Sequence, residues 1–141
     1  MLLVDANVLL CAVNERAAHH ARSRAWLRGA LDGEEAVAFT WLVLLAFLRL
    51  ATAPKVFPRP LATAEAVATL EAWLAQPVAV RLEPSGRHLA LVGGLLAEAG
   101  TAGNLVNDAH LAALAVEHDA EVVSFDSDFA RFPGVRWRRP A

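Results

Sequence analysis

The sequence predicts a doubly wound α/β domain, in which a central parallel β-sheet carries helices on both faces. Three observations lead to this fold class. Short apolar runs typical of buried strands recur along the chain, longer helical segments separate them, and no repeat or low-complexity stretch interrupts the alternation. The 141 residues, of which 56% are hydrophobic, suffice for a single domain over 1–141 with a substantial core.

The strands are placed by short runs rich in valine, leucine and phenylalanine. Both faces of a parallel sheet are covered by helices, so its strands read as continuous apolar runs rather than as alternating ones. Turn-forming or helix-capping residues bound each run. The expected strands, in chain order, are 2–4, 36–39, 78–82, 121–125 and a last short one at 135–137.

The helices are placed by their apolar faces and by their start and stop signals. Asp5, Thr40, Thr63 and Ser85 stand where helices are expected to begin. Glycines and prolines mark the ends, and three prolines make the segment 54–60 a loop. The expected helices begin after Asp5 and then cover 17–31, 41–50, 63–75, 85–100 and 108–117.

Composition limits the classes of protein to which the chain can belong. A net charge of −2 gives no general attraction to nucleic acid, so any RNA-binding surface has to be local. The single cysteine excludes an intrachain disulfide. The longest apolar run, 41–48, is far shorter than the roughly 20 residues of a membrane span, and the first residues lack the basic region of a signal peptide. These features predict a cytoplasmic protein with no membrane association.

Two arginine clusters are the candidate basic surfaces. Arginine is well suited to binding phosphate, but it is equally common in surface ion pairs. A solvated helix face and a charged tail explain the two clusters at least as well as RNA binding does. The clusters are Arg22, Arg24 and Arg28, and Arg136, Arg138 and Arg139.

The placement of the aspartates is the most informative feature of the sequence. Asp5 follows the first predicted strand, Asp126 follows the strand 121–125 with Asp128 two residues beyond, and Asp108 lies near the start of an apolar helix. In a parallel sheet, strand ends and the adjoining helix starts meet at one edge, so these acids can converge. Such a group repels itself unless a cation joins it, and carboxylates favour hard ions such as Mg²⁺ or Mn²⁺.

Each of these acids also has a purely structural interpretation. Asp5 can cap the first helix, Asp108 can complement a helix dipole, and Asp126 can cap a final turn. Taken singly, the structural interpretation is the stronger one for Asp108 and Asp126. Asp5 is different, because a charge beside a buried strand needs a partner.

Five segments of the chain, in this order, resemble the PIN-domain ribonucleases, and specifically the VapC-type toxins of bacterial toxin–antitoxin pairs. Asp-x-Asn after a strand is a common pattern, so no single segment is specific, but together they cover almost the whole chain. The segments are LVDANVLL at 3–10, WLVLLAFLRL at 41–50, GNLVNDAHLAALA at 103–115, VSFDSDF at 123–129 and FPGVRW at 132–137.

The resemblance implies a PIN-like central parallel sheet and Mg²⁺- or Mn²⁺-dependent cleavage of RNA. It also implies a homodimer and inhibition by a cognate antitoxin protein. Carried over by position, it implies catalytic and metal-binding roles for Asp5, Asp108 and Asp126, and makes Asp128 an additional metal ligand. Asn7 is expected to steady the site through hydrogen bonds.

Position 46 departs from the family pattern. Many members carry a glutamate on the helix after the second strand, where this chain has Ala46, and no acid occurs between Thr40 and Thr52. The site can hold one ion firmly and recruit a second with substrate. Alternatively, another carboxylate, first of all that of Asp128, replaces the missing one.

The leading hypothesis is therefore a metal-dependent endoribonuclease in which an activated water attacks a phosphodiester. A second hypothesis is a degenerate PIN-like module that binds RNA or a protein partner without cleaving. A third, a phosphoryl-transfer domain with an aspartyl nucleophile, ranks low because position 7 is Asn and the only lysine, Lys55, lies in the proline-rich loop. Part of the apolar helix 41–50, with the segment 66–74, is a candidate groove for an antitoxin helix.

Overall fold

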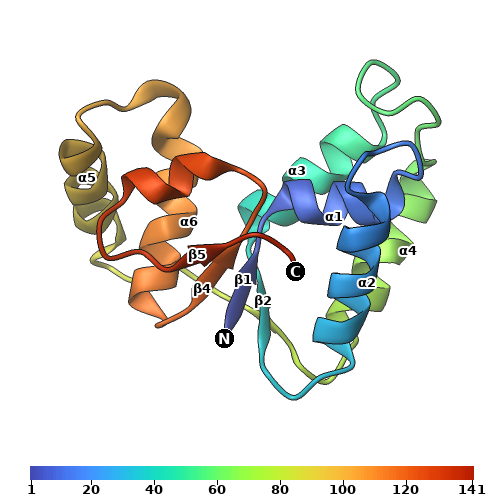
Figure 1. The fold of residues 1–141 in the computed structure, drawn as a ribbon, viewed down its shortest axis with the longest axis horizontal. Helices are drawn as coiled ribbons and strands as arrows, with labels where there is room; N and C mark the ends of the chain where they lie inside the picture. The colour runs from blue at the N-terminus through green and yellow to red at the C-terminus, as the bar shows by residue number, and fades with distance from the viewer.

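A five-stranded, entirely parallel β-sheet forms the centre of the computed structural model, which describes residues 1–141 (Figure 1). Its strand order is β3-β2-β1-β4-β5. The first four strands lie within the predicted ranges, and the last overlaps its predicted range only at Trp137; each is two or three residues long. The strands are β1 (Leu2–Val4), β2 (Val37–Phe39), β3 (Ala79–Arg81), β4 (Glu121–Val123) and β5 (Trp137–Arg138).

Helices cover both faces of this sheet, which confirms the predicted fold class. In Figure 1, α5 and α6 lie on one side of the strands, and α1 to α4 lie on the other. None of the helices is both long enough and apolar enough to cross a lipid bilayer. The helices are α1 (Ala6–Val13), α2 (His20–Leu31), α3 (Trp41–Ala51), α4 (Thr63–Leu74), α5 (His88–Ala99) and α6 (Val106–Glu117), with two 3₁₀ helices, η1 (Gly103–Leu105) and η2 (Ser127–Arg131).

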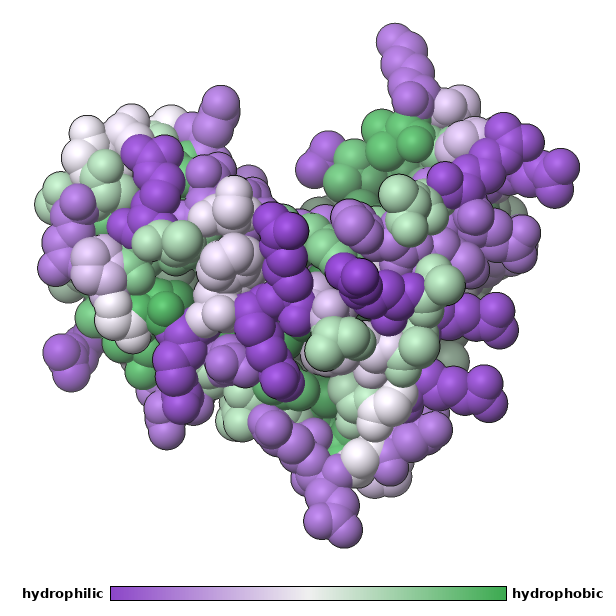
Figure 2. Space-filling view, viewed as in Figure 1, coloured by the Kyte–Doolittle hydropathy of each residue, from purple (hydrophilic) through white to green (hydrophobic).

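The strand order places a reversal of winding at the centre of the sheet. β1 pairs with β2 on one side, with Leu3 opposite Ala38, and with β4 on the other, with Leu3 opposite Val122. The chain therefore winds outward in one direction through β2 and β3, and in the other through β4 and β5. In open parallel sheets, ligands bind at such a switch point, beyond the carboxyl ends of the strands. Figure 2 shows the surface hollowed between the two lobes, toward which these strand ends point in Figure 1.

One apolar cluster of 30 buried residues packs around the sheet. β1 is buried along its whole length, and Phe39 and Phe47 are fully buried on β2 and α3. α6 contributes an unbroken buried run, Leu111–Ala115, in which three small alanines allow close packing. The strands and α6 that carry the predicted site residues are therefore anchored in the core.

The caps expected at two helix starts are present. Asp5 accepts a hydrogen bond from the Ala6 amide at 2.7 Å and begins α1, and the Thr40 hydroxyl accepts one from the Val43 amide at 3.3 Å and begins α3. α4 begins at Thr63, so its cap is Ala62, one residue before the predicted cap Thr63, and the Ala62 amide donates to the Glu65 carboxylate. α1 directly follows β1 and α3 directly follows β2, so both helices start at the carboxyl edge of the sheet. Their first residues line a pocket there.

Two predicted helix starts are wrong by three residues. α2 begins at His20 rather than at Ala17, because Asn14 first closes a turn with the amides of Arg16 and Ala17. α5 begins at His88 rather than at Ser85. The Ser85 amide and hydroxyl both donate to the Glu117 carboxylate of α6, and the hydroxyl accepts from the Arg87 amide in a turn that precedes the helix.

Candidate metal centre

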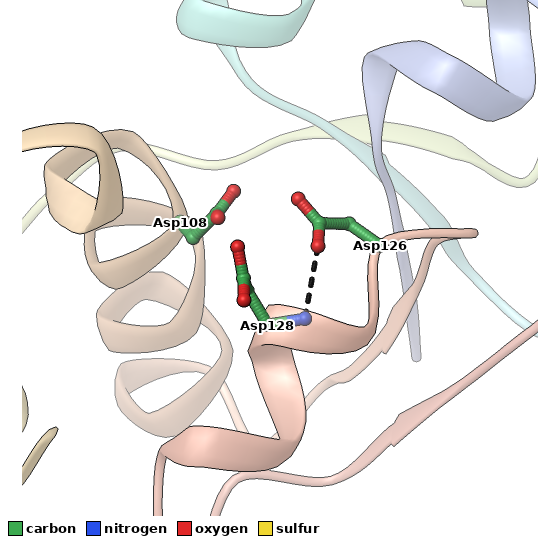
Figure 3. A group of neighbouring side chains, drawn as sticks. All are labelled: Asp108, Asp126 and Asp128. Atoms are coloured by element: carbon green, nitrogen blue, oxygen red, sulfur yellow. Dashed lines mark hydrogen bonds between the residues drawn. The ribbon is translucent and has the colours of Figure 1, made fainter.

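Three of the predicted aspartates converge at the carboxyl edge of the sheet. Asp108 lies in the first turn of α6, Asp126 directly precedes η2, and Asp128 lies in the first turn of η2. One carboxylate oxygen from each lies within 4.8 Å of the other two. Figure 3 shows the three side chains directed toward one another, Asp108 from the helix and the other two from the segment after β4. Residues 18 positions apart in sequence thus share one site, as the fold class predicts.

Asp126 also has the structural role that its position suggested. Its Oδ1 accepts a hydrogen bond from the Asp128 amide at 2.9 Å and thereby caps η2. The Asp126 amide in turn donates to the Ser124 hydroxyl at 3.0 Å. A carboxylate has about four acceptor positions, so this cap leaves Asp126 able to bind a cation.

Asp5 lies beside the three-acid group rather than within it. Together with Asp108 it lines a pocket of about 310 Å³, whose other wall is α3 and includes Ala46 and Arg49. The negative charge of Asp126 is one of the causes that raise the pKa of Asp5, which shows that the two carboxylates are close enough to interact. All four predicted acids therefore face one region, with Asp5 at its α1 end.

The Asp5 carboxylate is held by three donors. Its Oδ1 accepts from the Ala6 amide at 2.7 Å, and its Oδ2 accepts from the Ser124 hydroxyl at 2.7 Å and from the Asn7 amide group at 3.3 Å. Burial raises the pKa of Asp5 above its ordinary value, while the bonds from Ser124 and Ala6 oppose that rise. The protein itself fixes the orientation of this carboxylate.

Asn7 makes the hydrogen bonds that were expected of it. Its Nδ2 donates to the Ser124 hydroxyl at 2.9 Å as well as to Asp5, and its Oδ1 accepts from the Phe125 amide at 3.1 Å. Asn7 belongs to α1, whereas Ser124 and Phe125 follow β4. The side chain therefore locks the start of α1 to the chain segment that carries Asp126.

Ser124 is a site residue that sequence reasoning missed. It is fully buried, and its hydroxyl uses its whole bonding capacity: it donates to Asp5 and accepts from Asn7 and from the Asp126 amide. The signal available in the sequence is a polar residue at the end of a buried strand, two positions before Asp126. Without the structure, a serine at such a strand end looks like an ordinary start of a turn.

Asp108 is the least compensated of the acids. Burial raises its pKa to about 7, and the negative charges of Asp126, Asp5 and Asp128 contribute to the rise. A site in which several carboxylates repel one another at neutral pH is suited to a divalent cation. Ligand oxygens on opposite sides of an Mg²⁺ lie roughly 4 Å apart, so oxygens within 4.8 Å of one another need little movement to bind one. The donor set is entirely oxygen and fits such an ion.

Comparisons with known proteins place this geometry in a family. A model of the PIN domain matches residues 2–135. Over 140 residues, the chain is 56% identical to Ribonuclease VapC37 of Mycobacterium tuberculosis, covering 99% of this chain and 97% of that protein. The chain belongs to the PIN-domain family, among the VapC-type proteins. Ribonuclease VapC33 of the same organism is 41% identical, with 99% and 98% covered.

Solved structures share the fold of this VapC-type chain. VapC20 of M. tuberculosis, described as a sarcin–ricin loop cleaving toxin, has a TM-score of 0.69 at 19% identity, covering 96% of this chain and 99% of that one. VapBC-1 of nontypeable Haemophilus influenzae has a TM-score of 0.68 at 14% identity, covering 98% and 96%. At these identities the likeness shows the fold alone, and it agrees with the PIN-like sheet that the sequence predicted.

The alanine that stands in place of the usual family glutamate lies beside the acids in this VapC-type chain. Ala46 lies on α3 and lines the pocket that it shares with Asp5 and Asp108. Those two aspartates are the only carboxylates that line this pocket, so α3 contributes none. The charged side chain that α3 does contribute is the cation of Arg49.

Proposed function

We propose that this VapC-type protein is an endoribonuclease toxin that hydrolyses RNA phosphodiester bonds with the help of Mg²⁺ or Mn²⁺. The observation that carries the proposal is the convergence of Asp108, Asp126 and Asp128 within 4.8 Å, next to the hydrogen-bonded Asp5. The relatives that are 56% and 41% identical over 140 residues both bear the name ribonuclease. These acids lie at the carboxyl edge of the sheet, where ligands of open parallel sheets bind at the switch point.

Each acid has a role in the proposed reaction. Asp5 and Asp126 hold the ion, Asp108 ligates it or orients the attacking water, and Asp128 supplies a further ligand. A bound divalent ion stabilises charge on the phosphate and lowers the pKa of water. Ser124 touches no substrate in this scheme, and it positions Asp5 and Asp126 by bonding to both. No histidine or lysine is needed as a general base.

The first test is cleavage of total cellular RNA by the purified, antitoxin-free protein with Mg²⁺, Mn²⁺ or EDTA, beside an Asp5→Asn variant. Discrete fragments that require metal and vanish in the variant are the expected result, and their ends identify the substrate. The variant's circular dichroism and melting temperature check that it is folded. Intact RNA under every condition, from folded protein that still binds RNA or a protein partner, would overturn the enzyme proposal.

A non-cleaving PIN-like module is the second candidate function. One observation favours it: α3 contributes no carboxylate to the pocket, since position 46 is alanine. In that case RNA or a protein partner would bind with metal-independent affinity, and the Asp5→Asn substitution would leave this affinity unchanged. The cleavage experiment above therefore separates the two candidates directly.

We further propose that a cognate antitoxin inserts a helix beside α4. A groove of about 480 Å³ runs there. Its other wall is formed by α2 and the end of α1, whereas the sequence analysis predicted α3 in that place. Leu27, Leu31 and Trp73 give it an apolar floor, while Arg24 and Arg28 suit acidic side chains at the rim. Similar folds have been solved as VapBC pairs. Arg28→Glu is expected to weaken the complex, measured by titration calorimetry with the cognate antitoxin.

The sequence-based expectation of a homodimer stays a proposal and rests on exposed apolar side chains. No residue of the apolar helix α5 is buried, and Leu89 on it is 84% exposed. Trp41 on α3 is 51% exposed. Apolar surface of this kind is typical of interfaces, so a second copy is the expected cover. Light scattering of the purified protein measures the oligomeric state.

The single domain over 1–141 and the cytoplasmic location also remain predictions.

A further inference from the structure

One positively charged side chain, that of Arg49, lines the pocket beside the acids. Arg49 lies on α3, one turn after Ala46, and lines the same pocket as Asp5 and Asp108. The remaining lining is mostly apolar, with the polar side chain of Asn107 near the start of α6. A guanidinium group therefore stands across from the predicted metal ligands, on the opposite wall of the opening.

Arg49 has no partner within the protein. It is exposed, it makes none of the ion pairs in the structure, and its side chain donates no hydrogen bond. No positive charge is among the causes that set the raised pKa of Asp108, nor among those acting on Asp5. The guanidinium shares the pocket of these carboxylates without neutralising them. All five of its donor positions are available to a ligand.

Ala46 explains why this cation is free. Residues three apart on a helix lie on the same face, so an acid at position 46 would stand one turn from Arg49 and would pair with it. With alanine there, the guanidinium has no competing carboxylate on its own helix. Where many family members carry a glutamate on α3, this chain carries none, and the neighbouring cation of Arg49 is exposed.

We propose that Arg49 binds the phosphate of a nucleotide adjacent to the bond being cut, and so holds the RNA strand across the metal centre. This inference rests on the proposed ribonuclease function. An RNA backbone approaching four aspartates on a chain of net charge −2 needs a local cation, and the planar guanidinium binds phosphate oxygens in pairs. A purely apolar ligand would leave the guanidinium without a partner.

The test measures RNA binding and its salt dependence in the cleavage-inactive Asp5→Asn background, with a mixed-sequence single-stranded oligoribonucleotide as the probe and Mg²⁺ present. Arg49→Ala is expected to weaken binding about tenfold and to lower the slope of log K against log salt by about 0.7, the value for one lost phosphate contact on a single strand. Arg49→Lys keeps the slope and restores part of the affinity, because the charge remains but the paired geometry is lost.

Arg87→Ala is the matched control. Arg87 is also an exposed arginine without an ion pair, at the start of α5, and it lines none of the main pockets described above. It is expected to leave both affinity and slope unchanged. In the wild-type background, Arg49→Ala should raise KM for RNA about tenfold, while the Mn²⁺ affinity, measured by calorimetry, stays the same.

Two results would overturn the assignment while leaving the ribonuclease proposal standing. In the first, the wild type cleaves RNA and Arg49→Ala has the affinity and salt slope of Arg87→Ala. In the second, Arg49→Ala changes Mn²⁺ affinity but not the RNA slope, which would make Arg49 a counter-charge of the acids. A wild type that neither binds nor cuts RNA would overturn the proposed function itself, and the role of Arg49 with it.

Discussion

Asp5 and Asp108 line one pocket, but the protein holds them in opposite ways. Asp5 accepts three hydrogen bonds, from a backbone amide, a hydroxyl and a side-chain amide. Asp108 accepts none from such donors and lies among the negative charges of Asp126, Asp5 and Asp128. The comparison divides the site into two halves: hydrogen bonds within the fold organise one, and in the proposed function a cation would neutralise the other.

Asp126 joins the two halves. Its amide bonds to Ser124, which holds Asp5, while its carboxylate belongs to the group with Asp108 and Asp128. Removing its charge takes a proposed ligand from the cation-dependent half and also removes one of the causes that raise the pKa of Asp5. For this reason the comparison predicts the largest effect at this residue.

Asp126→Asn should reduce cleavage of RNA by more than about 100-fold. Loss of a residue that only hydrogen-bonds to a metal ligand costs up to roughly that much, and this substitution removes a proposed ligand itself. The asparagine can still cap η2 through its carbonyl oxygen, so the fold should survive. The measurement is kcat/KM on the fragment-yielding RNA at saturating Mg²⁺. Asp119→Asn is the control, since Asp119 is 95% exposed and forms only a surface ion pair with Arg136. Equal activities of the two variants would contradict the assignment.

The next largest effect is expected at the preorganised half. Ser124→Ala removes the donor to Asp5 Oδ2 and the acceptor of the Asp126 amide, without removing a proposed ligand. Loss of such a partner costs roughly 10- to 100-fold in metal affinity or activity. Mn²⁺ calorimetry and kcat/KM, measured together, should fall in parallel. A fall in thermal stability with unchanged Mn²⁺ affinity would show that Ser124 serves the fold alone.

These two residues also mark how far the sequence could predict the site. Asp126 could be placed, because parallel strands bring their carboxyl ends to one edge and the acid follows a strand. Ser124 could not, because its role depends on which neighbour its one proton reaches. Asp5 and Asn7 are brought to it by the fold from a segment more than 110 positions away in the sequence. Contacts of this kind are set by side-chain geometry rather than by periodicity.

In the fold, too, features with a local signal in the sequence were predictable and those set by packing were not. The three central strands were predictable, since buried parallel strands leave continuous apolar runs. The edge strands β3 and β5 contain no buried residue, and β5 overlaps its predicted range only at Trp137. The start of α3 was predictable, because the Thr40 hydroxyl caps it directly. The starts of α2 and α5 were not, because Asn14 and Ser85 each form a turn before the helix begins. The free cation at Arg49 could not be inferred from sequence either, because its lack of a partner is a property of the packed pocket.

The cation-dependent half predicts a pH effect of about tenfold. Asp108 must lose its proton to bind metal, and its pKa is raised to about 7 by burial and by the neighbouring acids. The apparent affinity for Mn²⁺ should therefore fall about tenfold from pH 8 to pH 6. Calorimetry at the two pH values measures it. In Asp108→Asn, the fall over this range should disappear, and its persistence would assign the proton to another group.

The same titration acts on stability with a definite sign. The Asp108 carboxyl titrates near its ordinary value of 3.8 when unfolded and near 7 when folded, so between these pH values the folded protein binds more protons. In EDTA, the melting temperature should accordingly fall as pH rises from about 4 to about 7. Mg²⁺ should abolish the fall by neutralising the carboxylates. A melting temperature that rises over this interval in both wild type and Asp108→Asn would contradict this account of the site.

The smallest effect is expected from Ala46→Glu, which gives α3 the carboxylate it lacks. The new acid faces the pocket of Asp5 and Asp108, so the Mg²⁺ concentration for half-maximal cleavage should fall a few-fold. It also stands one turn from Arg49, and pairing between them should raise KM for RNA. Ala46→Gln, equal in size but neutral, should change neither quantity in these directions. If the glutamate variant lowered the metal requirement without raising KM, the cation-dependent half would indeed be short of a ligand, but Arg49 would not be holding the substrate.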